Sequence, residues 1–111
     1  MPRKFGKLRG RRISFLKTLA NNLIMKERIQ TTDARAREMR GIVEKLVTLA
    51  KKQNLASLRL LLSRLPKASA MKIYYEIAPK YQTRAGGYLR ISKLAKRRKR
   101  DAAMQSMIEF V

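Results

Sequence analysis

The most informative side chains in this sequence are those of Lys and Arg, because of their number and their distribution. The 111 residues include 28 Lys and Arg against 7 Asp and Glu, a formal net charge of +21. Two segments, residues 1–12 and 80–100, are rich in these cations and contain no acid. Arg presents a planar fork and Lys a compact charge to phosphate oxygens, and neutralising phosphates releases counterions from a nucleic acid. Both segments therefore predict nucleic-acid binding, although charge alone does not identify the kind.

A second candidate feature is the pair Gly86-Gly87, flanked by Arg84, Tyr88 and Arg90. Two glycines let backbone amides approach a phosphate closely, and a Tyr ring can stack on an unpaired base. An ordinary turn with a packed Tyr88 explains the same residues equally well. The pair precedes a predicted strand, whereas the glycines of a dinucleotide-binding fingerprint follow a strand and open a helix. We therefore predict no dinucleotide site here.

Catalytic and metal-binding chemistry has little support in this sequence. Cys and His are both absent, which removes thiolate chemistry and the commonest general base and metal ligand. The acids are dispersed, whereas two-metal nuclease chemistry needs carboxylates within one site. We therefore predict that the protein is not an enzyme and needs no cofactor, metal or small-molecule substrate. The acids are Glu27, Asp33, Glu38, Glu44, Glu76, Asp101 and Glu109.

Apolar residues at helical spacing predict four helices that position these features. The first begins at Ile13, the second follows a cap at Thr32 and ends near Lys51, the third covers residues 55–65, and the fourth covers residues 69–78. A proline after each of the last two stops it, at Pro66 and Pro79. The stripes expected to face the core are Leu16, Leu19, Ala20, Leu23 and Ile24; Ala36, Met39, Val43, Leu46, Val47 and Ala50; Leu55, Leu58, Leu61, Leu62 and Leu65; and Met71, Tyr74, Tyr75 and Ala78.

Alternating apolar residues predict two strands in the last third of the chain. Residues 88–94 place Leu89 and Ile91 on one face, and residues 104–111 do the same with Ile108 and Phe110. The simplest connection is an antiparallel hairpin with the basic run 96–100 near its tip. A short strand at residues 28–31 could add a third strand. The predicted fold class is therefore α+β, with about four helices packed on a small mixed or antiparallel sheet.

The length fits a single domain, which we place at residues 13–111. Residues 1–12 hold six cations and little to bury, so they predict an extended basic arm that is disordered in isolation. No apolar run approaches the ~20 residues of a membrane span, and no signal peptide is visible. We therefore expect no membrane partner, and a location in the cytoplasm or in an organelle with similar interior chemistry.

Five separated stretches, in order, carry a family resemblance: residues 31–40, 46–51, 78–81, 84–91 and 108–111. Through them the chain resembles the bacterial large-subunit ribosomal protein L-seventeen family over nearly its whole length. The resemblance implies an α+β fold, binding to large-subunit rRNA beside neighbouring large-subunit proteins, and a position near the exit of the nascent-peptide tunnel. The chain departs from the family in a shorter arm without His, in Ala85 for a common Pro, and in Arg100 where Gly tends to precede Asp101.

A general nucleic-acid binder, such as a nucleoid protein or RNA chaperone, is the alternative, but it would lack this ordered series of matches. A membrane-active basic protein is disfavoured because the densest charge lies outside the predicted helices. Charge, the glycine pair and the resemblance together predict one set of RNA-binding residues. They are Arg3, Lys4, Lys7, Arg9, Arg11, Arg12, Lys17, Thr32, Arg35, Lys80, Arg84, Gly86, Gly87, Tyr88, Arg90, Lys93, Lys96, Arg97, Arg98, Lys99 and Arg100.

Overall fold

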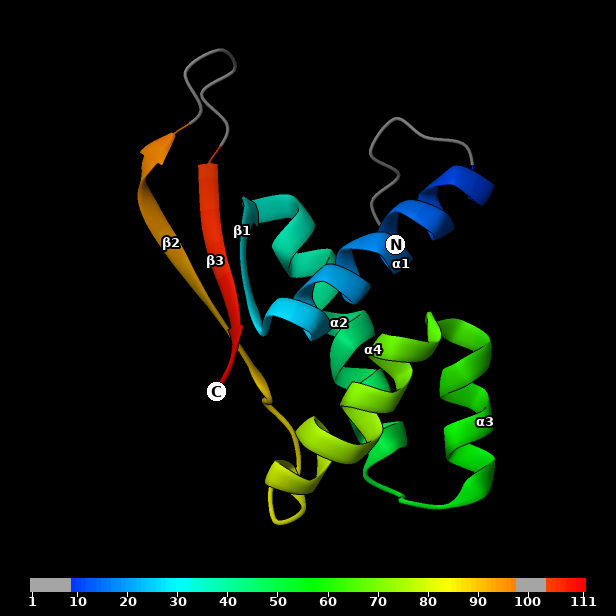
Figure 1. Cartoon of the computed structure of the whole chain (residues 1–111). Coiled ribbons are helices and arrows are strands. Elements are labelled where there is room, and N and C mark those ends of the chain that lie inside the picture. The colour runs from blue at the N-terminus through cyan, green and yellow to red at the C-terminus, as the bar shows by residue number, and fades with distance from the viewer. Residues whose placement is uncertain (1–8, 98–103) are drawn as a thin grey trace.

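The computed structural model describes residues 9–97 and 104–111, with side chains from residue 14 to residue 94 and from residue 104 onward. Helices and a three-stranded sheet form two layers (Figure 1), which confirms the predicted α+β class. The elements are α1 (Arg9–Lys26), β1 (Arg28–Thr32), α2 (Asp33–Ala50), α3 (Leu55–Arg64), α4 (Lys67–Lys72), the π-helix η1 (Ile73–Ile77), the 3-10 helix η2 (Ala78–Tyr81), β2 (Leu89–Arg97) and β3 (Met104–Phe110).

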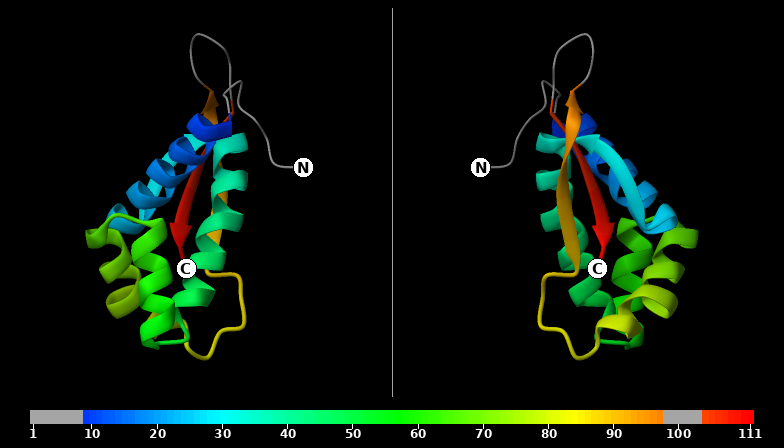
Figure 2. Two further views of the ribbon diagram at one scale, coloured as in Figure 1. Left: turned by 90° about the vertical axis from the view of Figure 1, so that its right-hand side faces the viewer. Right: turned by 90° about the vertical axis from the view of Figure 1, so that its left-hand side faces the viewer.

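The sheet has the order β1-β3-β2, and both pairings are antiparallel. Ile108 of β3 lies between Ile29 of β1 and Ile91 of β2 in the register. The predicted hairpin and the third strand are both confirmed. Helices α1 and α2 lie on one face of the sheet, and in the described part of the chain the other face is open (Figure 2).

The core forms where α1, α2 and the later helices meet the covered face of the sheet. Both predicted stripes of α1 and α2 are confirmed, because their residues are buried or, for Leu19, packed against the buried cluster. Burying apolar surface in this way is the main favourable contribution to folding. Ile108 and Leu89 join the same cluster from the sheet, so helices and strands share a single core.

Helix α1 begins at Arg9, four residues before the predicted start at Ile13. Residues 9–12 of the predicted arm are therefore helical. Arg is a good helix former, so this basic segment can extend the helix without adding to the apolar stripe from which the start was predicted. Residues 1–8 of the arm lie outside the described residues.

The third predicted stripe is only partly correct. Leu61 and Leu65 are buried and Leu58 packs against the core, but Leu55 and Leu62 are 61% and 40% exposed. Helix α3 lies at the outside of the bundle (Figure 1) and buries only a narrow face against α2 and α4. Its start is set by Asn54, whose side chain accepts a hydrogen bond from the Ser57 amide at 2.8 Å.

The fourth helix continues beyond its predicted end by changing its winding. Helix α4 passes into η1 and then η2, so Pro79 lies within the first two residues of a new turn, where no backbone N–H is needed. A π-turn holds one residue more than an α-turn and rotates the following side chains. Ile73, Tyr74 and Ile77 are consequently buried, and Tyr75, predicted to face the core, is 57% exposed.

Thr32 occupies the N-cap position of α2, but its side chain makes no capping hydrogen bond, so the predicted cap is wrong in its chemistry. Asp33 instead ties the helix start to the sheet. Its Oδ1 accepts a hydrogen bond from Ser106 Oγ at 2.9 Å, and its Oδ2 lies 3.0 Å from Arg37 Nε. A carboxylate in the first turn also favours the positive end of the helix dipole.

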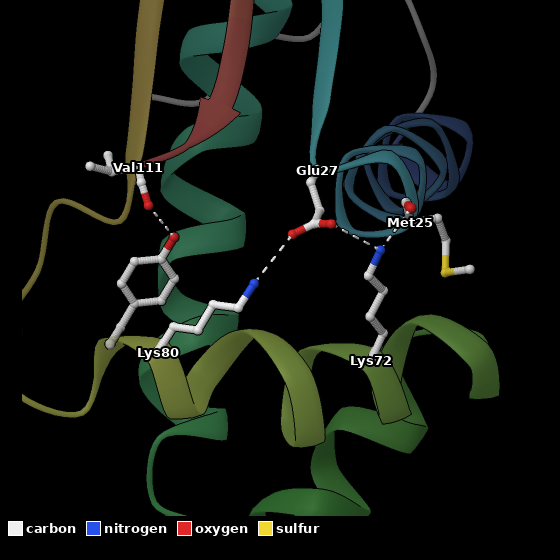
Figure 3. Close-up of polar contacts among 6 residues, drawn as sticks. Met25, Glu27, Lys72, Lys80 and Val111 are labelled. Carbon is white, nitrogen blue, oxygen red and sulfur yellow. Dashed lines mark hydrogen bonds and ion pairs between the residues drawn. The ribbon is translucent and has the colours of Figure 1, made fainter.

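Tyr81 links η2 to the end of β3. Its hydroxyl donates a hydrogen bond to the Val111 carbonyl oxygen at 2.7 Å (Figure 3). Two backbone hydrogen bonds hold the same segment, from the Phe110 amide to the Glu27 carbonyl and from the Val111 amide to the Tyr88 carbonyl. Burial raises the pKa of Tyr81 above its usual value near 10.

Tyr81→Phe should cost about 1 kcal/mol at neutral pH, the usual net contribution of one hydrogen bond. Because the pKa of Tyr81 is raised in the folded state, the stabilisation it supplies is fully present below about pH 10 and is lost as pH rises through the folded pKa. Urea unfolding between pH 8 and 11.5 should therefore show a steeper alkaline loss in the wild type than in the variant. Parallel alkaline curves would contradict the assignment.

Candidate nucleic-acid interface

The predicted RNA-binding residues with a described position do not form one patch. The molecule is elongated, with extents of 46 × 30 × 25 Å, and β2 alone spans nine residues, or about 30 Å at ~3.3 Å per residue. One group lies toward the end of the molecule where α1 and α2 start and β2 ends, and the other lies where β2 begins (Figure 1). Arg3, Lys4, Lys7, Arg98, Lys99 and Arg100 lie outside the described residues.

We call the first group the hairpin end: the start of α1, the first turn of α2 and the end of β2. These three segments lie toward the same end of the molecule in the views of Figures 1 and 2. The backbone of α1 brings Arg9, Arg11 and Arg12 there, and β2 brings Lys96 and Arg97. The Arg35 guanidinium lies 4.8 Å from the centroid of the Phe15 ring, a cation–π contact between α2 and α1.

We call the second group the loop end: Lys80, Arg84, Gly86 and Gly87, with Arg90 at the start of β2. Lys80 is not an isolated cation, because its Nζ lies 3.8 Å from Glu27 Oε1 (Figure 3). The Oε2 atom of the same carboxylate lies 3.6 Å from Lys72 Nζ. The exposed pair between Lys80 and Glu27 contributes about 0–1 kcal/mol, so it holds the Lys80 side chain only weakly.

Tyr88 is buried, with 1% of its surface exposed, so its ring has no face for an RNA base. Of the two alternatives for these residues, the structure therefore favours the turn with a packed Tyr88 over base stacking. Its hydroxyl accepts a hydrogen bond from Lys51 Nζ at 3.0 Å, and Lys51 also donates to the Arg84 carbonyl oxygen. The hydrogen bonds from Lys51 and Thr48 lower the pKa of Tyr88 below its usual value.

The glycine pair shapes this loop through one of its two members. Gly87 has φ +65°, a backbone conformation that L side chains rarely adopt. Gly86 lacks a positive φ, and a Cβ placed there would meet nothing within 4 Å. Lys51, 33 residues from Arg84 in the chain, fixes the loop by holding its carbonyl. Sequence reasoning missed Lys51, because nothing in the spacing links α2 to this loop.

The open face of the sheet carries a row of alternating charge. Glu109 of β3 lies between Arg28 and Arg90 in the register, and Arg90 Nη2 is 3.0 Å from Glu109 Oε1. Lys93 pairs with Ser106 on the other face of the sheet, the face that carries Ile91 and Ile108, and its side chain is exposed. Arg90 is paired with Glu109, whereas none of the described ion pairs involves Lys93.

Lys17 and Thr32 complete the predicted set. Lys17 is exposed on α1 between the two ends, and Thr32 is half-buried where β1 passes into α2.

Among the described residues, no cluster of three or more Asp or Glu side chains could hold a metal ion. None of the helices in the described ranges has the length and hydropathy to cross a membrane.

Comparisons with known proteins agree with one another. A family model described as "Ribosomal protein L17" matches residues 15–111. The chain is 47% identical over 110 residues to a protein of Desulfitobacterium hafniense, covering 98% of this chain and 97% of that one. It is 42% identical over 120 residues to a protein of Staphylococcus carnosus, covering 98% of each, and 42% identical over 108 residues to one of Hydrogenobaculum, covering 96% and 92%. Each of these relatives is named "Large ribosomal subunit protein bL17".

Proposed function

Since this chain belongs to the ribosomal protein L17 family of the large ribosomal subunit, we propose that it binds and stabilises the rRNA of that subunit. It does so as a structural constituent and not as an enzyme. The observation that carries the proposal is the net charge of +21, combined with cations placed at the two ends of an elongated molecule. Such a molecule can contact phosphates of two separate RNA segments at once, and the rigid domain between them fixes their spacing.

We further propose a position near the exit of the nascent-peptide tunnel, in contact with neighbouring large-subunit proteins. This part of the proposal rests on the family resemblance. Cross-linking in assembled subunits, followed by sequencing of the attached RNA and identification of attached proteins, tests it directly. Cross-links confined to RNA far from the tunnel exit would contradict the position and leave the rRNA-binding proposal intact.

Binding to large-subunit rRNA should depend steeply on salt. If roughly ten cations engage phosphates, the slope of log affinity against log salt should be about −7 to −9. The measurement is a titration of the full chain with transcribed large-subunit rRNA between 50 and 300 mM KCl. A slope shallower than about −2 would contradict an electrostatic mode of binding. An equal affinity for unrelated double-stranded DNA would favour the general nucleic-acid binder instead.

A further inference from the structure

A groove lies where α1 faces α2 and the end of α3. Its volume is 250 Å³, below the ~300–1,000 Å³ typical of sites for drug-sized ligands. The floor is aliphatic and is made by Leu16, Ala20, Ile42, Leu46 and Leu65. Most of these side chains are nearly buried, so the groove is a shallow opening in the core.

Three cations, one from each helix, surround this aliphatic floor: Lys17, Lys45 and Arg64. All three are exposed, and none forms an ion pair with an acid in the described part of the chain. No Asp or Glu lines the groove. The site therefore combines an apolar surface with a purely positive rim, which suits a flat apolar group attached to an anion.

A second hollow, more polar than the groove, adjoins it and shares Lys17 and Arg64 with it. Thr18 and Ser63, which both carry hydroxyls, line its walls. These hydroxyls donate to the carbonyl oxygens of Ser14 and Leu60, at 3.0 and 2.7 Å. Since their protons are already engaged, their oxygens face a ligand as acceptors, and the ligand must supply the donor.

We propose that this groove holds one unpaired nucleotide of RNA, with its base on the aliphatic floor and its phosphate between Lys17 and Arg64. The ribose then lies in the polar hollow, where its 2′-hydroxyl can donate to Thr18 or Ser63. The inference rests on the proposed function and extends it. The two ends of the molecule would contact phosphates, whereas the groove would bind an unpaired base. Proteins that bind extruded bases seat them between aromatic or apolar side chains.

The rim also favours particular bases. With Lys17 and Arg64 at the phosphate, Lys45 is the rim cation left for the base, and it supplies hydrogen-bond donors and no acceptor. Guanine presents two acceptors, O6 and N7, on one edge, and Lys or Arg pairs with them. Adenine places an amino donor at the corresponding position, where it would meet another donor. Guanine is therefore the expected base.

Methyl NMR of the full chain tests whether a base enters the groove. The probe is the RNA trinucleotide UGU, compared with the same trinucleotide lacking its central base. A base on the floor should shift the methyl signals of Leu16, Ile42 and Leu65 through its ring current, and the abasic probe, which has no ring there, should shift them much less. Methyl signals that stay unmoved while backbone amides shift elsewhere would overturn the proposal. Larger methyl shifts with the peptide Glu-Phe-Glu than with UGU would also overturn it, in favour of a protein partner.

Two matched variants on α3 test the rim. Arg64→Gln removes a cation of the groove, and Arg59→Gln removes an exposed cation of the same helix that does not line it. Arg64→Gln should weaken binding to large-subunit rRNA about tenfold, the loss of one charged hydrogen bond, and lower the salt slope by ~0.7. Arg59→Gln should change affinity less than about twofold, as a surface charge outside the interface. If thermal unfolding shows that Arg64→Gln disturbs the fold, Lys45→Gln repeats the test with a rim cation of α2.

Equal affinities of the Arg59, Arg64 and Lys45 variants would overturn the groove assignment. If the wild type still bound rRNA with a steep salt slope, rRNA binding would stand and only the nucleotide site would fall. A wild-type slope shallower than about −2 would instead remove the proposed function itself. The two failures are therefore distinguishable in one set of titrations.

Discussion

A chain in which Lys96, Arg97, Arg98, Lys99 and Arg100 are all Ser should bind large-subunit rRNA with a salt slope about two to four units shallower than the wild type. Each phosphate contact contributes ~0.7 to 0.9 to that slope, and this run holds five cations with no acid between residues 80 and 100. The described part of β2 carries the start of the run, Lys96 and Arg97, to the hairpin end. The fold should survive, because removing like charges relieves repulsion in a chain of +21.

The matched control for this variant replaces the three arginines of the run by Lys. It retains all five charges, so its slope should equal that of the wild type, with a modest loss of affinity where a forked guanidinium contact is lost. Salt-dependent titrations and thermal unfolding of both variants decide the matter. An unchanged slope in the Ser variant, with unchanged incorporation into the large subunit, would make the run a solubilising tip. Loss of cooperative unfolding would make it structural.

Ile108→Ala should destabilise the domain by about 2–5 kcal/mol, the range for truncating a fully buried aliphatic side chain. Ile108 has no exposed surface and lies on the central strand, between Ile29 and Ile91. A hole at this position cannot be closed by moving an edge strand, because both neighbours are hydrogen-bonded to β3. Domains of this size have only about 5–15 kcal/mol of stability, so the variant should lose a large share of it.

Ile108→Val is the matched control, because it removes one methylene and should cost about 0.5–1.5 kcal/mol. Urea unfolding of the three proteins, with the slope against denaturant compared as well as the midpoint, gives the free energies. The salt slope of rRNA binding should stay the same in both variants, since neither changes a charge. A cost below about 1 kcal/mol for the Ala variant would mean that the sheet contributes little to the common core.

Elements whose apolar stripe packs fully against neighbours were predictable from the sequence. The second helix is the clearest case: Met39, Val43 and Val47 lie at helical spacing and are all completely buried. The hairpin was predictable for the same reason, since Leu89 and Ile91, and likewise Ile108 and Phe110, lie two residues apart and pack in or against the core. In these elements the residues at the periodic apolar positions are the ones that the fold buries.

The prediction failed where local spacing did not determine the environment. Leu55 and Leu62 follow the helical period, but α3 has a neighbour on one side only and leaves them exposed. Tyr75 was displaced from the core by a π-turn, which no periodic pattern anticipates. For the candidate interface, Tyr88 proved to be a buried residue held by Lys51, a contact between segments 37 residues apart.

The strand order has a consequence for how the chain acquires its structure. The two edge strands, β1 and β2, meet only through β3, which is the last of the three to be synthesised. Until β3 arrives, β1 has an unpaired backbone, although the helices between the strands can already pack by contacts closer in sequence. Pairing of Arg28 with Glu109 closes a long loop, and contacts of such high sequence separation form slowly. We therefore expect closure of the sheet to be a late step in folding.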